Sequence, residues 1–159
     1  MTELLVSILI ASVLILTIGV MTTVANNSFK KANFRQSVYN DLSFGFKLLQ
    51  AKVRVANSIA TGNKPAPWIS GQHFLINTNA TFGLCQYSFS TDQCQSGGSE
   101  TALVYTDGAN QETILRVPAP GTITVSFPAL TTTAVTISVS GAKNGVSFSM
   151  QTTATRRNL

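Results

Sequence analysis

Two cysteines are the residues whose type and spacing most directly indicate chemistry. Cys85 and Cys94 lie close together in a stretch rich in Gly, Ser and Gln. With only two thiols and a single histidine, His73, the sequence lacks the four Cys or His ligands of a structural zinc site. We therefore expect a local disulfide, a bond that persists in oxidising compartments. Two buried, unpaired thiols in a cytosolic domain are the alternative.

The other titratable residues do not form a catalytic pattern. His73 has no companion histidine, and we expect a strand or loop residue rather than a general base. The Gly-rich segment 96–99 lacks the lysine and the helix start of a phosphate-binding loop. Four acidic residues lie in or beside predicted turns or strand ends, without the spacing of a calcium loop: Asp92, Glu100, Asp107 and Glu112. We therefore expect a protein that is not an enzyme and that holds no metal or cofactor.

The first 25 residues carry the strongest pattern of the sequence. From Leu4 to Ala25 no side chain is charged, and Leu, Ile and Val fill most positions. At about 1.5 Å per residue, a helix of this length crosses a hydrocarbon core of about 30 Å. A cleaved signal peptide would need a basic front and a shorter apolar core. We expect instead a helix that spans a membrane or is buried in an assembly.

Glu3 is the one acid at the front of this apolar run. A carboxylate near a helix N-terminus is favoured by the helix dipole, and Thr2 beside it is a suitable cap. A charge drawn into an apolar environment also needs a partner, because leaving it unpaired costs at least about 2.5 kcal/mol. No basic residue lies within the run. The amino terminus of a neighbouring subunit would serve as that partner.

The helical pattern continues beyond the apolar run. Apolar residues recur at three- and four-residue steps, which predicts a buried face made of Val38, Leu42, Gly45, Leu49, Val53 and Ala56. A second, mostly apolar face has the same period: Phe34, Asp41, Phe44, Leu48, Ala51 and Val55. Because no proline precedes Pro65, we expect one helix from about residue 2 to about residue 56, hydrophobic over 1–27 and amphipathic over 28–56. The second face needs a partner outside the chain.

Residues 57–159 are expected to form a connector and a β-sheet domain. Gly, Asn and Pro residues mark 57–71 as an irregular connector, which Trp68 would pin to the helix. Asp107-Gly108 and Asn144-Gly145 are hairpin turn signals. A period of two predicts strands near 72–78, 83–89, 101–107, 112–118, 121–128, 133–140 and 145–153. The expected fold is α+β, with the second half of the long helix packed on an antiparallel sheet.

The net charge of +5 is unevenly distributed. Basic residues cluster just after the apolar run: Lys30, Lys31, Arg35, Lys47, Lys52, Arg54 and Lys64. Such a cluster usually marks the cytoplasmic side of a span or binds anionic head groups, whereas a disulfide indicates an oxidising compartment. Contact with nucleic acid is a further reading, but few aromatic residues are interleaved with these charges, so a solvated helix face is favoured.

The chain opens with Thr2-Glu3-Leu4-Leu5-Val6-Ser7-Ile8-Leu9-Ile10-Ala11-Ser12, which resembles the mature N-terminus of type IV pilins and of type II secretion pseudopilins. Members of that family begin with an aromatic residue or Met, followed by a Thr/Ser-Leu-Val/Ile-Glu-Leu-Leu/Met-Val pattern that opens a long apolar helix. The resemblance is specific over roughly the first 25 residues. As an architecture it extends over the whole chain, with a long helix, a connector, an antiparallel sheet and one disulfide.

The resemblance implies the type IV pilin fold and a role for individual residues. The family's glutamate, at the fifth mature position, pairs with a neighbour's amine during assembly, and only Glu3 matches it. Glu3 stands two places early, so the resemblance implies that two residues and a leader precede Met1. It also implies a prepilin peptidase that cuts after a glycine and N-methylates the new amine. Many bacterial pilins have a helix-breaking proline near the position of Val20; here Gly19 would soften the helix instead.

The resemblance further implies a subunit that enters the inner membrane with its domain outside the cytoplasm, where Cys85 and Cys94 oxidise. The expected function is a structural pilin that polymerises with identical or homologous subunits into an extracellular filament, assisted by the pilus assembly machinery. A minor pilin or pseudopilin that primes or caps a filament is the alternative within the family. A membrane-anchored binding module that never assembles is the alternative outside it.

Overall fold

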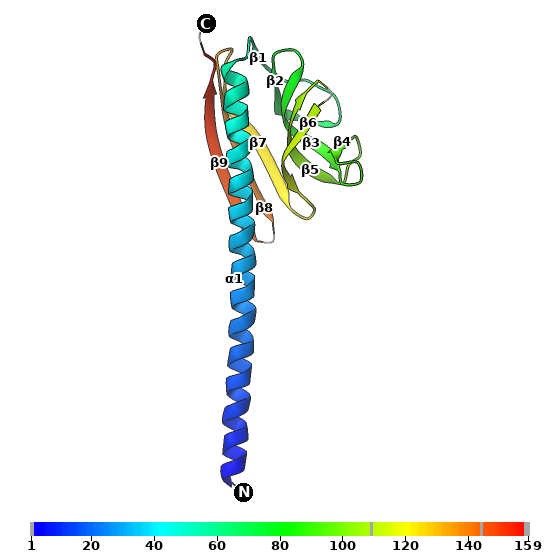
Figure 1. Ribbon diagram of the computed structural model, residues 1–159. Helices are drawn as coiled ribbons and strands as arrows, with labels where there is room; N and C mark the ends of the chain where they lie inside the picture. The colour runs from blue at the N-terminus through cyan, green and yellow to red at the C-terminus, as the bar shows by residue number, and fades with distance from the viewer. Residues whose placement is uncertain (1, 109, 144, 158–159) are drawn as a thin grey trace. The chain divides into compact units, whose positions relative to one another are not determined.

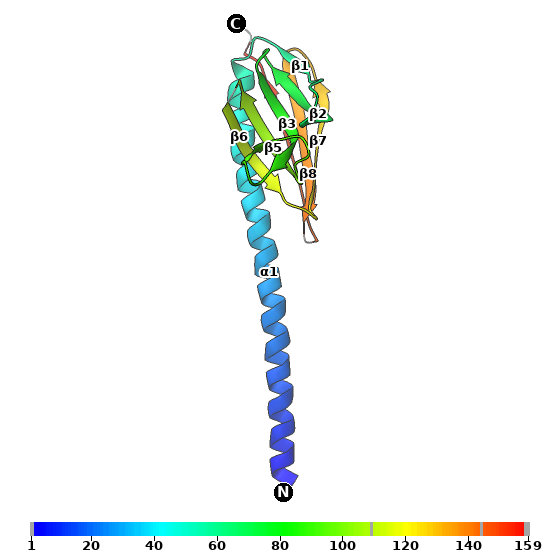
Figure 2. The ribbon, with the colours of Figure 1, turned by 90° about the vertical axis from the view of Figure 1, so that its right-hand side faces the viewer.

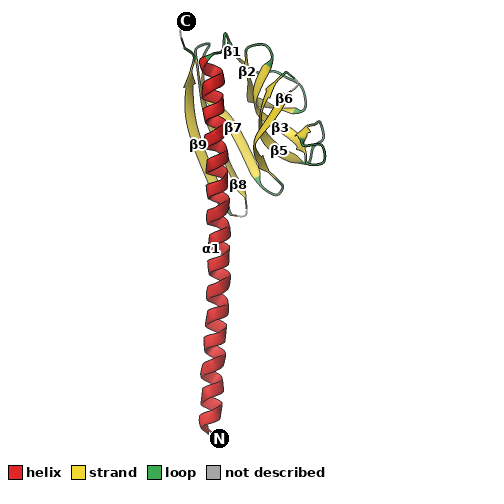
Figure 3. Ribbon diagram, viewed as in Figure 1, coloured by secondary structure: helices red, strands yellow, loops and turns green. Residues whose placement is uncertain are grey.

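The computed structural model describes residues 2–108, 110–143 and 145–157. One helix and nine strands follow one another along these residues (Figures 1 and 3). The elements are α1 (Thr2–Arg54), β1 (Ile59–Thr61), β2 (Trp68–Ile76), β3 (Ala80–Ser88), β4 (Gln93–Cys94), β5 (Glu100–Asp107), β6 (Asn110–Val117), β7 (Thr122–Leu130), β8 (Ala134–Lys143) and β9 (Val146–Thr155). The chain forms two compact units, residues 1–36 and residues 37–159.

The first unit is helical from Thr2 onward, as the apolar run predicts. Its described side chains are exposed as far as Asn33. By length and composition, α1 is apolar and long enough to cross a membrane. The helix ends at Arg54, two residues before the expected end.

The second unit contains two antiparallel sheets rather than the single sheet expected. In the first sheet the order is β1-β2-β3-β5-β6 (Figure 2), with β4 paired to β3. In the second sheet the order is β7-β8-β9. Pro118 and Pro120 separate β6 from β7, and a proline has no backbone N–H to donate to a ladder. The expected strands are present, but β1 and β4 were not predicted. The expected connector 57–71 was wrong in part, because it contains β1 and the start of β2.

The second half of α1 covers these sheets with the face that the sequence predicts. All six residues of that face are buried: Val38, Leu42, Gly45, Leu49, Val53 and Ala56. Phe46 is also buried, although it lies outside the predicted stripe. Gly45 faces β6 so closely that a Cβ atom there would lie 2.3 Å from Cγ2 of Ile114. The general α+β class is therefore confirmed for the described residues.

The two sheets meet along β2 and β7. The rings of Phe74 and Phe127 contact edge to face, with centroids 5.3 Å apart. The backbone N–H of Val125 donates to Oε1 of Gln72 at 2.9 Å. This hydrogen bond satisfies an N–H group on the edge of β7 that pairs with no other strand. The sequence suggested that Trp68 pins the connector to the helix, and this expectation was wrong. Trp68 lies at the start of β2 and packs on the sheet beside Cys85.

Candidate functional site

Glu3 lies in the first turn of α1, where the helix dipole favours a carboxylate. Within the described part of the chain no ion pair involves Glu3, and no basic side chain occurs between it and Lys30. The hydroxyl of Ser7 donates to the backbone carbonyl of Glu3 at 2.9 Å, so this contact leaves the carboxylate unaltered. The carboxylate is available to a positive group of another molecule.

The helix behind Glu3 presents a large apolar surface. Exposed aliphatic side chains occur on all sides of it: Leu4, Val6, Ile8, Leu9, Ile10, Val13, Leu14, Ile15, Leu16, Ile18, Val20, Met21 and Val24. A patch of this size is typical of a surface that contacts a membrane or another protein. Polar residues within it are satisfied locally: the hydroxyls of Ser12, Thr17, Thr22 and Thr23 donate to carbonyls three or four residues earlier.

Gly19 lies inside the helix, which continues through it without interruption. A Cβ atom at this position would have nothing within 4 Å. No close contact therefore requires a glycine here, and its proposed softening of the helix stays a prediction.

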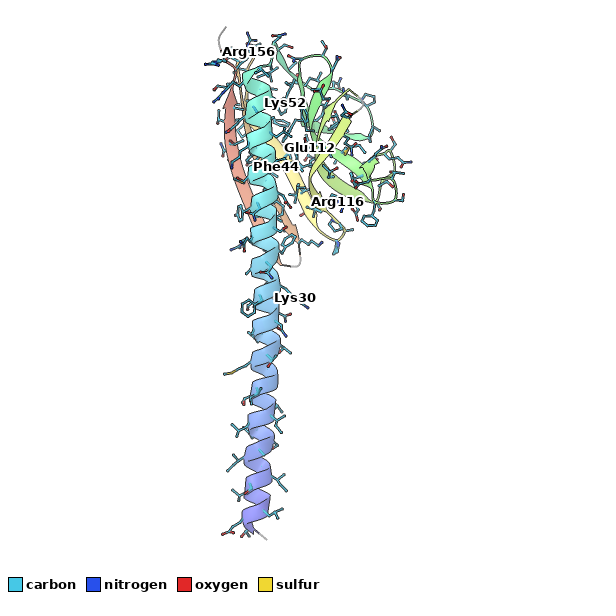
Figure 4. All side chains as sticks on the ribbon, in the orientation of Figure 1. Lys30, Phe44, Lys52, Glu112, Arg116 and Arg156 are labelled. Atoms are coloured by element: carbon cyan, nitrogen blue, oxygen red, sulfur yellow. A yellow bond between two sulfur atoms is a disulfide. The ribbon has the colours of Figure 1, made fainter. Side chains whose placement is uncertain are left out.

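The second apolar face of α1 is largely uncovered in the second unit. Phe44 is 57% exposed (Figure 4). Val55, directly after the end of α1, is 73% exposed, while Leu48 is half-buried. Asp41 lies on the same face, and burial raises the pKa of its carboxyl, although a hydrogen bond with Ser37 opposes the shift. This face has the composition of a contact surface rather than of a solvated helix side.

The predicted disulfide is confirmed. Cys85 and Cys94 are bonded, and their Cα atoms are 5.7 Å apart. Cys85 belongs to a buried cluster with Tyr87, Ala102 and Val104, against which Trp68 packs. The bond therefore fastens the β3–β4 turn to the core of the first sheet.

Beside the disulfide, Arg116 organises the loop that follows β3. Its Cζ atom lies 5.3 Å from the ring centroid of Phe89 and 5.7 Å from that of Tyr87. Its Nη1 atom lies 3.4 Å from Oδ1 of Asp92, which also accepts a hydrogen bond from the Tyr87 hydroxyl. Burial, and then Asp92, raise the pKa of Tyr87. Sequence reasoning missed this cluster, because no spacing links Arg116 to a loop on another strand.

His73 has no nitrogen left for catalysis. It is buried on β2, where Nε2 accepts from the backbone N–H of Lys64 at 3.0 Å. Its Nδ1 atom lies 2.9 Å from the carbonyl of Ile69 and donates to it. The imidazole thus ties β2 to the preceding loop, as a structural residue does.

Three shallow depressions border α1 among the described residues of the second unit, and the smallest, of about 260 Å³, is lined by Lys52, Val55 and Asn77. Asp41, Thr113 and Arg116 line one of about 490 Å³, and Lys52 and Glu112 line another of about 390 Å³. No group of three metal-ligating side chains occurs among the described residues. The basic side chains that line these depressions form ion pairs: Lys52 pairs with Asp107 at 3.8 Å, and Arg116 pairs with Asp92.

Tyr105, on β5, lies beneath the side chain of Lys52 in α1. The ammonium group is 5.3 Å from the ring centroid, and the Tyr105 hydroxyl donates to Asp107 at 3.3 Å. Burial, followed by the negative charge of Asp107, raises the pKa of Tyr105 to about 12. This group stays protonated at neutral pH and is a structural hydrogen-bond donor.

Comparison of the chain with protein-family models, with characterised proteins and with solved structures finds no match to any of them.

Proposed function

We propose that the chain is a structural pilin, a subunit that polymerises into an extracellular filament through its N-terminal helix. The observation that carries the proposal is the apolar helix surface from Leu4 to Val24, with Glu3 at its front and no ion pair to Glu3 among the described residues. Burying such a surface contributes roughly 25 cal/mol per Å². A bilayer provides that burial first, and the helices of other copies provide it after assembly.

The position of Glu3 supports assembly over simple anchoring. A carboxylate within apolar surroundings needs a positive partner, and no basic side chain lies between Glu3 and Lys30 in the described residues. The free amine at the start of another subunit's helix has the right charge and would lie at the right depth. The attraction would set the axial register between neighbouring subunits.

The second apolar face supports the same proposal. A membrane anchor needs apolar residues only over about 20 positions, yet Phe44 is exposed in the second half of α1 and Val55 is exposed directly after its end. A subunit inside a filament has neighbours along the whole helix and would cover these side chains. The proposal assigns no catalytic role to any residue.

Replacement of Glu3 tests the proposal. Cells that express Glu3→Ala should produce the protein in the membrane and no filaments by electron microscopy, whereas the matched variant Glu100→Gln should assemble normally. Normal filaments from Glu3→Ala would contradict the pairing role. A wild-type chain that stays in the membrane without filaments would favour the anchored binding module, and one copy at a filament tip would favour the minor pilin.

A further inference from the structure

The outer strands of the two sheets differ in how they are protected. An edge strand offers unpaired N–H and C=O groups to other chains, and proteins blunt such edges with charges, prolines, bulges or short strands. Three of the outer strands among the described residues are blunted. β1 has three residues, β6 carries Glu112 and Arg116, and β7 contains Pro128. The pairings of β6 and β7 also contain register shifts.

β9 has none of these protections. Its ten residues, Val146–Thr155, include no charged residue, no proline and no glycine. Its pairing with β8 continues from Val146 to Thr155 without a register shift. It is therefore a long, regular edge of the kind that pairs readily with another strand.

The backbone groups that β9 offers can be assigned from its hydrogen bonds. The N–H of Arg156 donates to the carbonyl of Thr133 at 2.7 Å, so the even-numbered residues bond toward β8. The odd-numbered residues point the other way. In agreement, the carbonyl of Thr153 accepts from Gln50 at 3.5 Å and the N–H of Arg157 donates to the carbonyl of Arg54 at 3.1 Å. The helix thus occupies the C-terminal end of this edge.

The open part of the edge is the segment Ser147–Gln151. Side chains of its odd-numbered residues are exposed, small or uncharged, and they continue cross-strand rows of the same character. One row consists of Thr124, Ser140 and Ser149, and the next of Ser126, Ser138 and Gln151. Hydroxyl and amide groups cost less to remove from water than charged groups do, and hydrogen bonds to a second such face offset the cost that remains.

We propose that β9 pairs antiparallel with β9 of a second copy of this chain, through the outward backbone groups of Ser147, Ser149 and Gln151. Two identical strands in antiparallel order satisfy each other's donors and acceptors around a two-fold axis. The chain carries a net charge of +5, but the segment Ser147–Gln151 has no charged side chain, and pairing centred on Ser149 leaves Lys143, Arg156 and Arg157 outside that segment. A two-fold contact closes on itself and cannot extend a polar filament. It joins two molecules, or two filaments that lie side by side.

The test measures self-association of the full chain in an excess of detergent micelles by analytical ultracentrifugation. Wild type should form a dimer. Ser149→Pro removes one outward N–H from each copy, and Ser149→Lys places two like charges near each other, so each should weaken the dimer at least about tenfold. The control Thr124→Lys makes a similar charge change on the same cross-strand row, two strands from the edge, and should dimerise like wild type.

A monomeric wild type, or equal dimerisation of wild type and both Ser149 variants, would overturn the proposal and leave the edge to an extended segment of another protein. Ser149→Lys keeps the test valid if Ser149→Pro does not fold. The outcome is separable from the filament proposal, because Glu3→Ala should abolish filaments and keep the dimer. Ser149→Lys should abolish the dimer and keep single filaments.

Discussion

Gly45 is a position where the backbone of α1 approaches β6 too closely for a side chain. A Cβ atom there would lie 2.3 Å from Ile114, inside van der Waals contact. Gly45→Ala should therefore lower the free energy of unfolding by about 1–3 kcal/mol, as overpacking of a core does. Thermal or urea unfolding of the full chain in detergent measures the change.

Gly19 supplies the matched control, because it lies in the same helix with nothing within 4 Å of a Cβ atom. Gly19→Ala should not lower the free energy of unfolding of the second unit, because the added methyl group contacts nothing within 4 Å. Alanine is also favoured over glycine in a helix, by about 1 kcal/mol. A similar loss of stability from Gly19→Ala would contradict contact with Ile114 as the cause of the loss at Gly45.

Tyr105 gives the chain a predictable alkaline limit. Its pKa is raised to about 12 by burial and by Asp107, whereas an unfolded tyrosine titrates near pH 10. Between these values the folded state holds the proton and the unfolded state loses it, so stability falls as pH rises. Urea unfolding between pH 9 and about pH 12 should show this loss, and Tyr105→Phe should reduce its slope. An identical slope in the variant would contradict the assignment.

The disulfide stabilises the β3–β4 turn in a way that its loop length predicts. Closing the loop between Cys85 and Cys94, whose sequence separation is 9, contributes roughly 2.5–3 kcal/mol in the chain-entropy model. Replacing both residues, Cys85→Ala with Cys94→Ser, should lower the free energy of unfolding by about that amount. Reduction of the wild type with dithiothreitol should cause a similar loss, and the variant should not respond to the reductant.

The sequence predicts those elements whose periodicity is regular and whose partners lie within the chain. The helix and its buried face were predictable, because Val38, Leu42, Leu49 and Val53 repeat at helical spacing. The division into two sheets was not, because strand propensity does not state which strands pair. β4 has only two residues, which is too short for an alternating pattern to predict it.

The candidate site was predictable to the same extent. Glu3, Cys85 and Cys94 could be named because local sequence places them. The Arg116 cluster and the open edge of β9 could not, because each depends on contacts between strands distant in sequence. The pairing of β9 with β8 alone, which leaves that edge free, appears only once the order of the strands is known.

The chain as a whole combines a stable unit with surfaces that no part of the described chain covers. Residues 37–159 bury one face of α1 and keep a second face exposed. The side chain of Phe44 is therefore only partly buried when this unit folds. Under the filament proposal, contact with other copies explains why a surface that folding does not need stays apolar. Phe44 is therefore the residue at which folding and assembly can be separated.

Phe44→Ser should change the free energy of unfolding by less than about 0.5–1 kcal/mol and still reduce the number of filaments sharply. Loss of an aromatic anchor from a repeated interface acts at every subunit contact, so a small effect per contact is multiplied along the polymer. Phe89→Ser is the control, because Phe89 is 70% exposed on the loop after β3 and lies outside the α1 face. Electron microscopy of cells that express each variant, with surface protein quantified, gives the comparison. If Phe44→Ser assembles as well as Phe89→Ser, the second face of α1 is not a subunit interface, and the filament would rest on the surface from Leu4 to Val24 alone.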